Sequence, residues 1–105
     1  MIEEINNILI EIVCIFKKYI CINEYEIFLF GSRASDLASD RSDIDIGILG
    51  SQPLPLATLN DIKAEIEEIK TLYSIDIVDF ASVTEDFKEI ALKKRVFIDE
   101  QGIRK

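Results

Sequence analysis

The stretch FGSRASDLASDRSDIDIGIL, residues 30–49, decides the fold that the rest of the sequence predicts. It opens, after the apolar run YEIFL, with Phe30 and the pair Gly31 and Ser32, and it ends in a second apolar run that contains Asp43 and Asp45. The ten residues between Ser32 and Asp43 are mostly polar or small, with Ser, Asp and Ala prominent. This order predicts a buried strand, a tight turn, a short helix and a second strand.

The second strand presents a pair of carboxylates. Alternate residues of a strand point to the same side, so Asp43 and Asp45 leave one face while Ile44, Ile46 and Ile48 enter the core. Two carboxylates this close repel each other unless a cation lies between them, and Mg²⁺ prefers oxygen ligands of this kind. A bare Asp-x-Asp pattern is more often an exposed acidic strand face, because short motifs match by accident.

The turn before the pair has the chemistry of a phosphate site. Gly31 has no Cβ, so its backbone can turn tightly and approach a phosphate. A helix predicted over residues 33–38 would offer free N–H groups to an anion, and Ser32 and Arg33 add further donors. An ordinary turn with a helix cap explains Gly31 and Ser32 equally well when they are taken alone. Turn and strand together predict phosphate ligands next to metal ligands.

A third acid is expected from the strand IDIVDF, residues 75–80. If Ile75 and Ile77 face the core, Asp76 lies on the open face of the sheet together with the other carboxylates. Asp79 would then point the other way near the end of the strand, where a carboxylate commonly caps local backbone. We therefore favour Asp76 as the third acid and keep Asp79 as the alternative.

Composition limits the class of protein. The chain has 105 residues, 49% of them hydrophobic and 30% charged, which is typical of one compact domain, residues 1–105. The net charge of −8 disfavours non-specific binding to nucleic acid. The absence of His excludes Ser-His and Cys-His catalytic pairs. No apolar run is long enough to span a bilayer, and the N-terminus lacks a basic signal region, so we expect a cytoplasmic protein and no membrane partner.

Hydrophobic periodicity predicts the other elements. The pattern favours helices over residues 2–19, 56–72 and 84–94, strands over 25–30 and 75–80, a short edge strand over 96–98, and a loose tail over 100–105. In the first helix we expect Cys14, Tyr19 and Cys21 to be buried, with the two thiols too far apart for a disulfide. In the second we expect Leu56 to join the apolar stripe. Alternating helices and strands predict an α/β (α+β) fold, a small mixed β-sheet with flanking helices.

At this point the motifs resemble a known family. The Gly-Ser pair, a gap of ten residues and the Asp-x-Asp pair are similar to the nucleotidyltransferase superfamily that includes DNA polymerase beta. The short length and the strings GSRA, SDIDIGIL and YSIDIVDF most resemble the minimal nucleotidyltransferase (MNT) domains. The resemblance covers nearly the whole chain and implies the nucleotidyltransferase fold.

The resemblance also implies an activity, in which AMP is transferred from ATP to a hydroxyl group with the aid of one or two Mg²⁺ ions. The residues that it places in the site are the catalytic and metal-binding acids Asp43, Asp45 and Asp76 and the nucleotide-binding residues Gly31 and Ser32. The donors of Arg33 add a third nucleotide-binding residue. The chain departs from the family pattern at Ser35 and Asp36, where an Arg-Gly pair is frequent. An acid that faced the triphosphate would weaken nucleotide binding.

Free-standing MNT domains are similar to antitoxins that pair with a HEPN-domain ribonuclease toxin and adenylylate a tyrosine of it. The resemblance therefore implies a HEPN toxin as partner, in a hetero-oligomer. An alternative is an antitoxin that neutralises its partner by binding alone, and a third is transfer to RNA or to a small molecule. Retention of three acids favours catalysis, and the acidic charge argues against RNA. The basic run at 93–95 is expected to be solvated, with contact to phosphate as a minority hypothesis.

Overall fold

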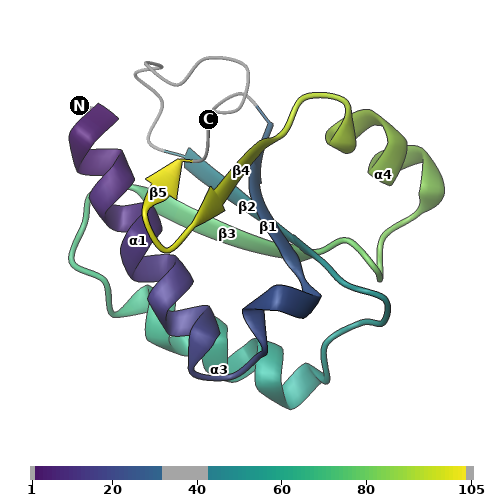
Figure 1. Ribbon diagram of the computed structural model, residues 1–105, viewed down its shortest axis with the longest axis horizontal. Helices are drawn as coiled ribbons and strands as arrows, with labels where there is room; N and C mark the ends of the chain where they lie inside the picture. Colours follow the sequence, from purple (N-terminus) through teal and green to yellow (C-terminus); the bar gives the residue numbers. More distant parts are fainter. Residues whose placement is uncertain (1, 32–42, 104–105) are drawn as a thin grey trace.

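A computed structural model describes residues 2–31 and 43–103 of the chain. Figure 1 shows its helices and strands, and the short helix expected over residues 33–38 lies outside the described residues. The elements, in chain order, are α1 (Ile2–Lys17), the 3-10 turn η1 (Ile22–Glu24), β1 (Glu26–Phe30), β2 (Asp43–Leu49), α3 (Leu56–Glu67), β3 (Ser74–Asp79), α4 (Glu85–Leu92), β4 (Val96–Asp99) and β5 (Gly102–Ile103).

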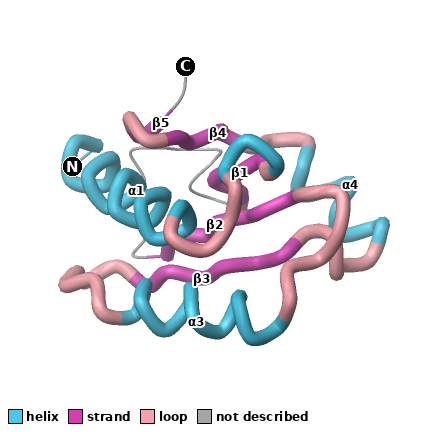
Figure 2. Tube along the Cα trace, turned by 60° about the horizontal axis from the view of Figure 1, so that its bottom comes forward, coloured by secondary structure: helices cyan, strands magenta, loops and turns pink. Residues whose placement is uncertain are grey.

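The strands form one mixed sheet, as the alternation of elements predicts. Its order is β3-β2-β1-β4-β5, with β2 and β3 parallel and the other neighbours antiparallel. The parallel pair is connected through α3, which runs along β3 at one side of the sheet (Figure 2). A crossover of this kind brings the starts of β2 and β3 to the same end of the sheet, next to the end of β1.

One face of the sheet is covered by α1 and α3. Alternate residues of β1, β2 and β3 enter this layer, and the apolar stripes of the two helices meet them. The fully buried members with the largest side chains are Leu9, Ile12, Phe16, Leu29, Ile44, Ile46, Ile48 and Ile62. Burial of this aliphatic layer, at about 25 cal/mol for each Å² of apolar surface, is the main force that holds the helices on the sheet.

The opposite face carries an aromatic cluster under α4. Phe28 and Phe30 of β1 and Phe80, just beyond β3, are buried there and contact one another with ring centroids 4.9–6.4 Å apart. Gly47 of β2 lies beneath them, and a Cβ at this position would be 2.4 Å from the Phe28 ring and 2.6 Å from the Phe80 ring. The glycine therefore makes the space that the aromatic rings fill.

Several expectations on helix faces are wrong. Cys14 and Cys21 are exposed and free, because the buried stripe of α1 runs through Leu9, Ile12 and Phe16 and leaves Cys14 on the other side, while Cys21 follows the end of the helix. Tyr19 is 37% exposed, since α1 ends at Lys17.

Two boundaries also differ from expectation. The helix expected over residues 56–72 ends at Glu67, and its first residue, Leu56, is 72% exposed. The tail expected to be loose contains β5, where the N–H of Ile103 donates to Asn6 Oδ1 at 2.8 Å, so the tail is tied to α1. Among the described residues, no helix has the length and apolar character needed to span a membrane.

Candidate active site

The two acids of β2 lie on the aromatic face of the sheet, at the end where the strand begins. Asp43 is exposed and Asp45 is half-buried, while Ile44 and Ile46 between and beyond them are fully buried on the opposite face. This is the alternation that the sequence predicts. It follows from the two-residue period of a strand whose other face is covered by helices.

Asp76 of β3 lies beside Asp45. The parallel register pairs Asp45 with Asp76 and Asp43 with Ser74, so the four side chains occupy neighbouring positions on one face. Adjacent strands are about 4.8 Å apart, which is within reach of carboxylates that share a ligand. The sheet therefore places Asp43, Asp45 and Asp76 at neighbouring positions on one face.

The surroundings of the Asp45 carboxylate disfavour its charged form. Its pKa is raised above the ordinary aspartate value, first by burial and then by the negative charges of Asp76 and Asp43. Within residues 2–31 and 43–103, no group of three or more Asp, Glu or Cys side chains is arranged so that it could hold a metal ion. Carboxylates that repel one another are expected to stay apart until a bound cation offsets their charge. Asp43, Asp45 and Asp76 are thus neighbouring potential ligands that do not surround a common point.

Gly31 closes the site on the side of β1. Its φ is +75°, a conformation that residues with a Cβ rarely adopt, and an added Cβ would lie 2.7 Å from Asp45 Oδ2. The backbone turn thus passes directly against the carboxylate of Asp45. Ser32 and Arg33, which the sequence analysis assigns to nucleotide binding, lie outside the described residues.

Asp79, the alternative third acid, has a different environment. It is buried, at 8% exposure, and its two oxygens accept hydrogen bonds from the N–H of Leu54 at 2.7 Å and the N–H of Ala81 at 3.0 Å. The carboxylate thus ties the loop before α3 to the end of β3. The bond from Ala81 is a local backbone cap of the kind expected for Asp79, whereas the bond from Leu54 joins two distant parts of the chain.

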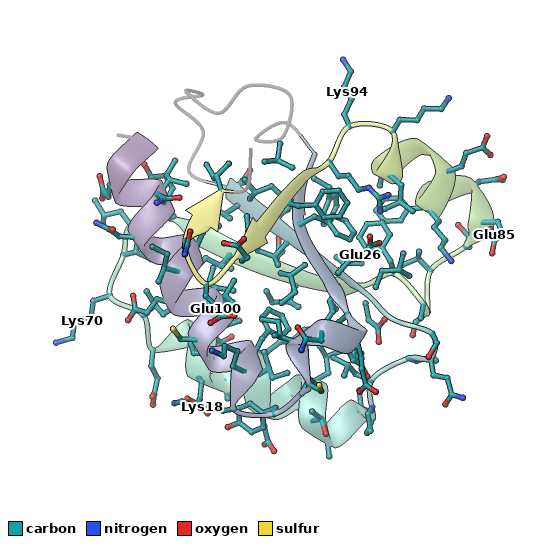
Figure 3. All side chains as sticks on the ribbon, in the orientation of Figure 1. Lys18, Glu26, Lys70, Glu85, Lys94 and Glu100 are labelled. Carbon is teal, nitrogen blue, oxygen red and sulfur yellow. The ribbon has the colours of Figure 1, made fainter. Side chains whose placement is uncertain are left out.

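The basic run at 93–95 does not converge on the acids as a group. The guanidinium of Arg95 lies over the rings of Phe97, at 4.8 Å, and Phe28, at 5.6 Å, and pairs with Glu26 at 3.4 Å. Lys94 projects away from the body of the molecule (Figure 3). Arg95 is therefore held by aromatic and acidic partners of its own.

Sequence reasoning missed two neighbours of the acids. Ser74 stands next to Asp43 in the register, and the alternation Ser-x-Asp at the start of β3 is the signal that could have located it. Phe30 is paired with Asp45 across β1 and β2, which places the aromatic cluster next to the half-buried carboxylate. Phe30 and Asp45 are neighbours only because residues 26–30 pair with 45–49 in antiparallel register. A prediction of that register is therefore the signal that could have indicated the contact.

Comparison with known sequences places these features in context. Residues 10–102 match the family model described as polymerase beta, nucleotidyltransferase. The chain is 33% identical, over 78 residues, to a probable protein adenylyltransferase, MntA, of Haemophilus influenzae; the match covers 74% of this chain and 68% of the relative.

Solved structures share the fold. A crystal structure of a toxin–antitoxin with AMP-PNP superposes with a TM-score of 0.64 at 20% identity, over 88% of this chain and 70% of that one. The MNT antitoxin in complex with a tri-AMPylated HEPN toxin of Shewanella oneidensis gives a TM-score of 0.64 at 20% identity, over 92% and 71% of the two chains. These likenesses agree with the mixed sheet and its flanking helices.

Proposed function

Because this chain belongs to the polymerase beta nucleotidyltransferase family, we propose that it transfers AMP from ATP to a hydroxyl group of a partner protein. The observation that carries the proposal is the register of β2 and β3, which sets Asp45 beside Asp76, together with the contact between Asp45 and the Gly31 turn. Acids for a cation and a glycine turn for phosphates are then next to each other, as transfer of a nucleotidyl group requires.

Mg²⁺ fits the donor set. The oxygens of Asp43, Asp45 and Asp76 are ligands of the kind that this ion prefers. Burial, followed by the negative charges of Asp76 and Asp43, raises the pKa of Asp45, and a bound cation would favour its charged form again. When bound, Mg²⁺ would supply electrostatic stabilisation of the triphosphate and of the charge that develops during transfer. One or two ions are compatible with these three carboxylates.

The chain's own residues then have distinct roles in our proposal. The Gly31 turn holds the triphosphate through backbone N–H groups, aided by Ser32 and Arg33. Asp76 accepts the proton of the attacking hydroxyl. A bond forms between the hydroxyl oxygen and the α-phosphorus, the bond from that phosphorus to the bridging oxygen breaks, and pyrophosphate leaves. Positioning and charge neutralisation account for most of the rate enhancement.

We further propose that the acceptor is a tyrosine of a HEPN-domain toxin, so that the chain acts as an antitoxin in the cytoplasm. The names of the relatives support this: one is a probable protein adenylyltransferase, and another is an MNT antitoxin bound to an AMPylated HEPN toxin. The net charge of −8 also suits a basic partner that handles RNA.

The alternative is an antitoxin that inhibits by binding without chemistry. To separate the two, the chain is incubated with Mg²⁺, the HEPN protein and ATP labelled on the α-phosphate. We expect label on a tyrosine of the partner, and its loss in Asp43→Asn. Asp61→Asn is the matched control, because this exposed carboxylate lies on α3, which covers the opposite face. Tight binding without label would show the binding-only function instead.

A further inference from the structure

We infer that Phe87 of α4, which packs on the aromatic cluster of Phe28, Phe30 and Phe80, is the ring on which the nucleobase stacks. This inference rests on the proposed function, because it assigns a part of the same nucleotide site. The group that would stack on Phe87 is uncharged and flat, and in ATP this group is the adenine base.

Phe87 is the exposed end of a column of rings. It is 43% exposed, and its ring lies almost parallel to that of Phe80, at 16° and a centroid distance of 5.6 Å. Phe80 is fully buried, and Phe30 packs edge-on against both rings at 4.9 and 6.2 Å. The buried rings fix Phe87 from below, so a further ring can extend the stack with little loss of side-chain freedom.

The column begins next to the candidate active site. Phe30 is paired with Asp45 across the strands and directly precedes Gly31 in the chain. Side chains opposite each other in an antiparallel pair have Cβ atoms about 5 Å apart. The ring centroids of Phe30 and Phe87 are 6.2 Å apart, so a single side chain, Phe30, links Asp45 to Phe87. The sugar of a nucleotide covers this kind of span between the α-phosphate and the base.

The strand order favours the base over the ring of an acceptor tyrosine. Gly31, proposed to hold the triphosphate, and Phe30 both belong to the β1 side of the site, whereas Asp76, proposed to take the hydroxyl proton, lies on β3 across β2. Triphosphate and base are parts of one molecule, and Phe30, which directly precedes Gly31, is one of the two rings that contact Phe87. The other ring, Phe80, follows the end of β3, whereas Asp76 lies near the start of that strand. Glu85 and Asp86 in the first turn of α4 disfavour phosphate near Phe87 but leave an uncharged base unaffected.

The test compares two ligands by calorimetry in the presence of Mg²⁺: ATP, which has a base, and inorganic tripolyphosphate, which lacks one. Stacking of a base on an aromatic side chain corresponds to roughly a 5- to 150-fold change in affinity. We expect Phe87→Ala to weaken binding of ATP by a factor in this range and to leave tripolyphosphate unchanged. Phe87→Trp should retain ATP binding, because it keeps a flat ring, whereas Phe87→Leu should not.

Leu56→Ala is the matched control, since Leu56 is an exposed apolar residue at the start of α3 and should have no effect on either ligand. Unchanged ATP affinity in Phe87→Ala would overturn the inference, and a raised KM for the partner protein alone would assign the surface to the acceptor instead. Equal weakening of both ligands would also overturn it. ATP binding is measured whether or not AMP is transferred, so a failure of transfer in the wild-type chain contradicts the proposed function and not this inference.

Discussion

Replacing Gly31 by Ala should damage both the stability of the chain and its handling of nucleotide. The residue has φ +75°, and a side chain in this left-handed region costs about 1–2 kcal/mol. The new Cβ would also lie 2.7 Å from Asp45 Oδ2, so the carboxylate must move. For a domain of this size, each kcal/mol lowers Tm by about 4–8 °C.

The assay pairs thermal unfolding with transfer of label from ATP. Gly102→Ala is a matched control, because Gly102 also has positive φ, at +98°, and its Cβ would meet the side chain of Asn6. Gly102 belongs to β5, which is separated from β2 by β4 and β1. Both variants should unfold at lower temperature, but only Gly31→Ala should lose transfer, by roughly 100-fold or more for misplaced catalytic groups.

Equal loss of transfer in the two variants, measured well below their Tm, would refute this reasoning. It would mean that backbone strain alone, whether after the central strand β1 or in the edge strand β5, reduces activity. Full activity in Gly31→Ala would refute it as well, because Asp45 would then tolerate displacement.

Three further predictions address the acid assignment, the aromatic layer and pH. Asp79→Asn should lower the free energy of unfolding by about 1–3 kcal/mol in urea titrations, because one buried N–H loses its acceptor. Asp76 is exposed, so Asp76→Asn should change the free energy of unfolding by less than about 0.5 kcal/mol but abolish transfer. The reverse pattern would exchange the roles of the two residues. Gly47→Ala should cost about 1–3 kcal/mol in the same titration through overpacking against the aromatic rings, and a neutral result would contradict the described packing. The hydrogen bond that Tyr19 donates to Glu65 raises the pKa of Tyr19 to about 12. The contribution of this hydrogen bond to stability is therefore complete below the unfolded-state pKa of about 10 and is lost as pH rises from there to about 12. The difference in Tm between wild type and Tyr19→Phe should shrink across that window, and a constant difference would contradict the assignment.

The acidic site was predictable because its signals are local. The alternation of Asp and Ile in residues 43–48 fixes the face of each side chain, and a Gly between an apolar run and a polar segment indicates a tight turn. The choice of Asp76 over Asp79 follows from the same two-residue period. What the pattern could not supply is the register that pairs Asp45 with Asp76, because the pairing of parallel strands depends on how α3 packs.

Other features depend on contacts between distant parts of the chain. The strand β5 forms where Asn6 of α1 accepts a hydrogen bond from Ile103, and no pattern within residues 100–105 indicates that partner. The aromatic cluster requires Gly47 to lie beneath Phe28 of β1 and Phe80, which follows β3, so it depends on how three separate segments pair. Cys14 is exposed because it lies on the face of α1 opposite the buried residues, so a count of apolar residues alone misjudges it.

Manganese binding, followed by electron paramagnetic resonance in the presence of ATP, tests most directly whether Asp43, Asp45 and Asp76 form one cation site. Mn²⁺ takes oxygen ligands as Mg²⁺ does and reports its own bound fraction. We expect Mn²⁺ to bind the wild-type chain and Asp79→Asn, with affinity at least about tenfold weaker in Asp45→Asn and Asp76→Asn, a loss of about 1.4 kcal/mol. Equal affinity in all four proteins, or no bound Mn²⁺ in the wild type, would contradict it.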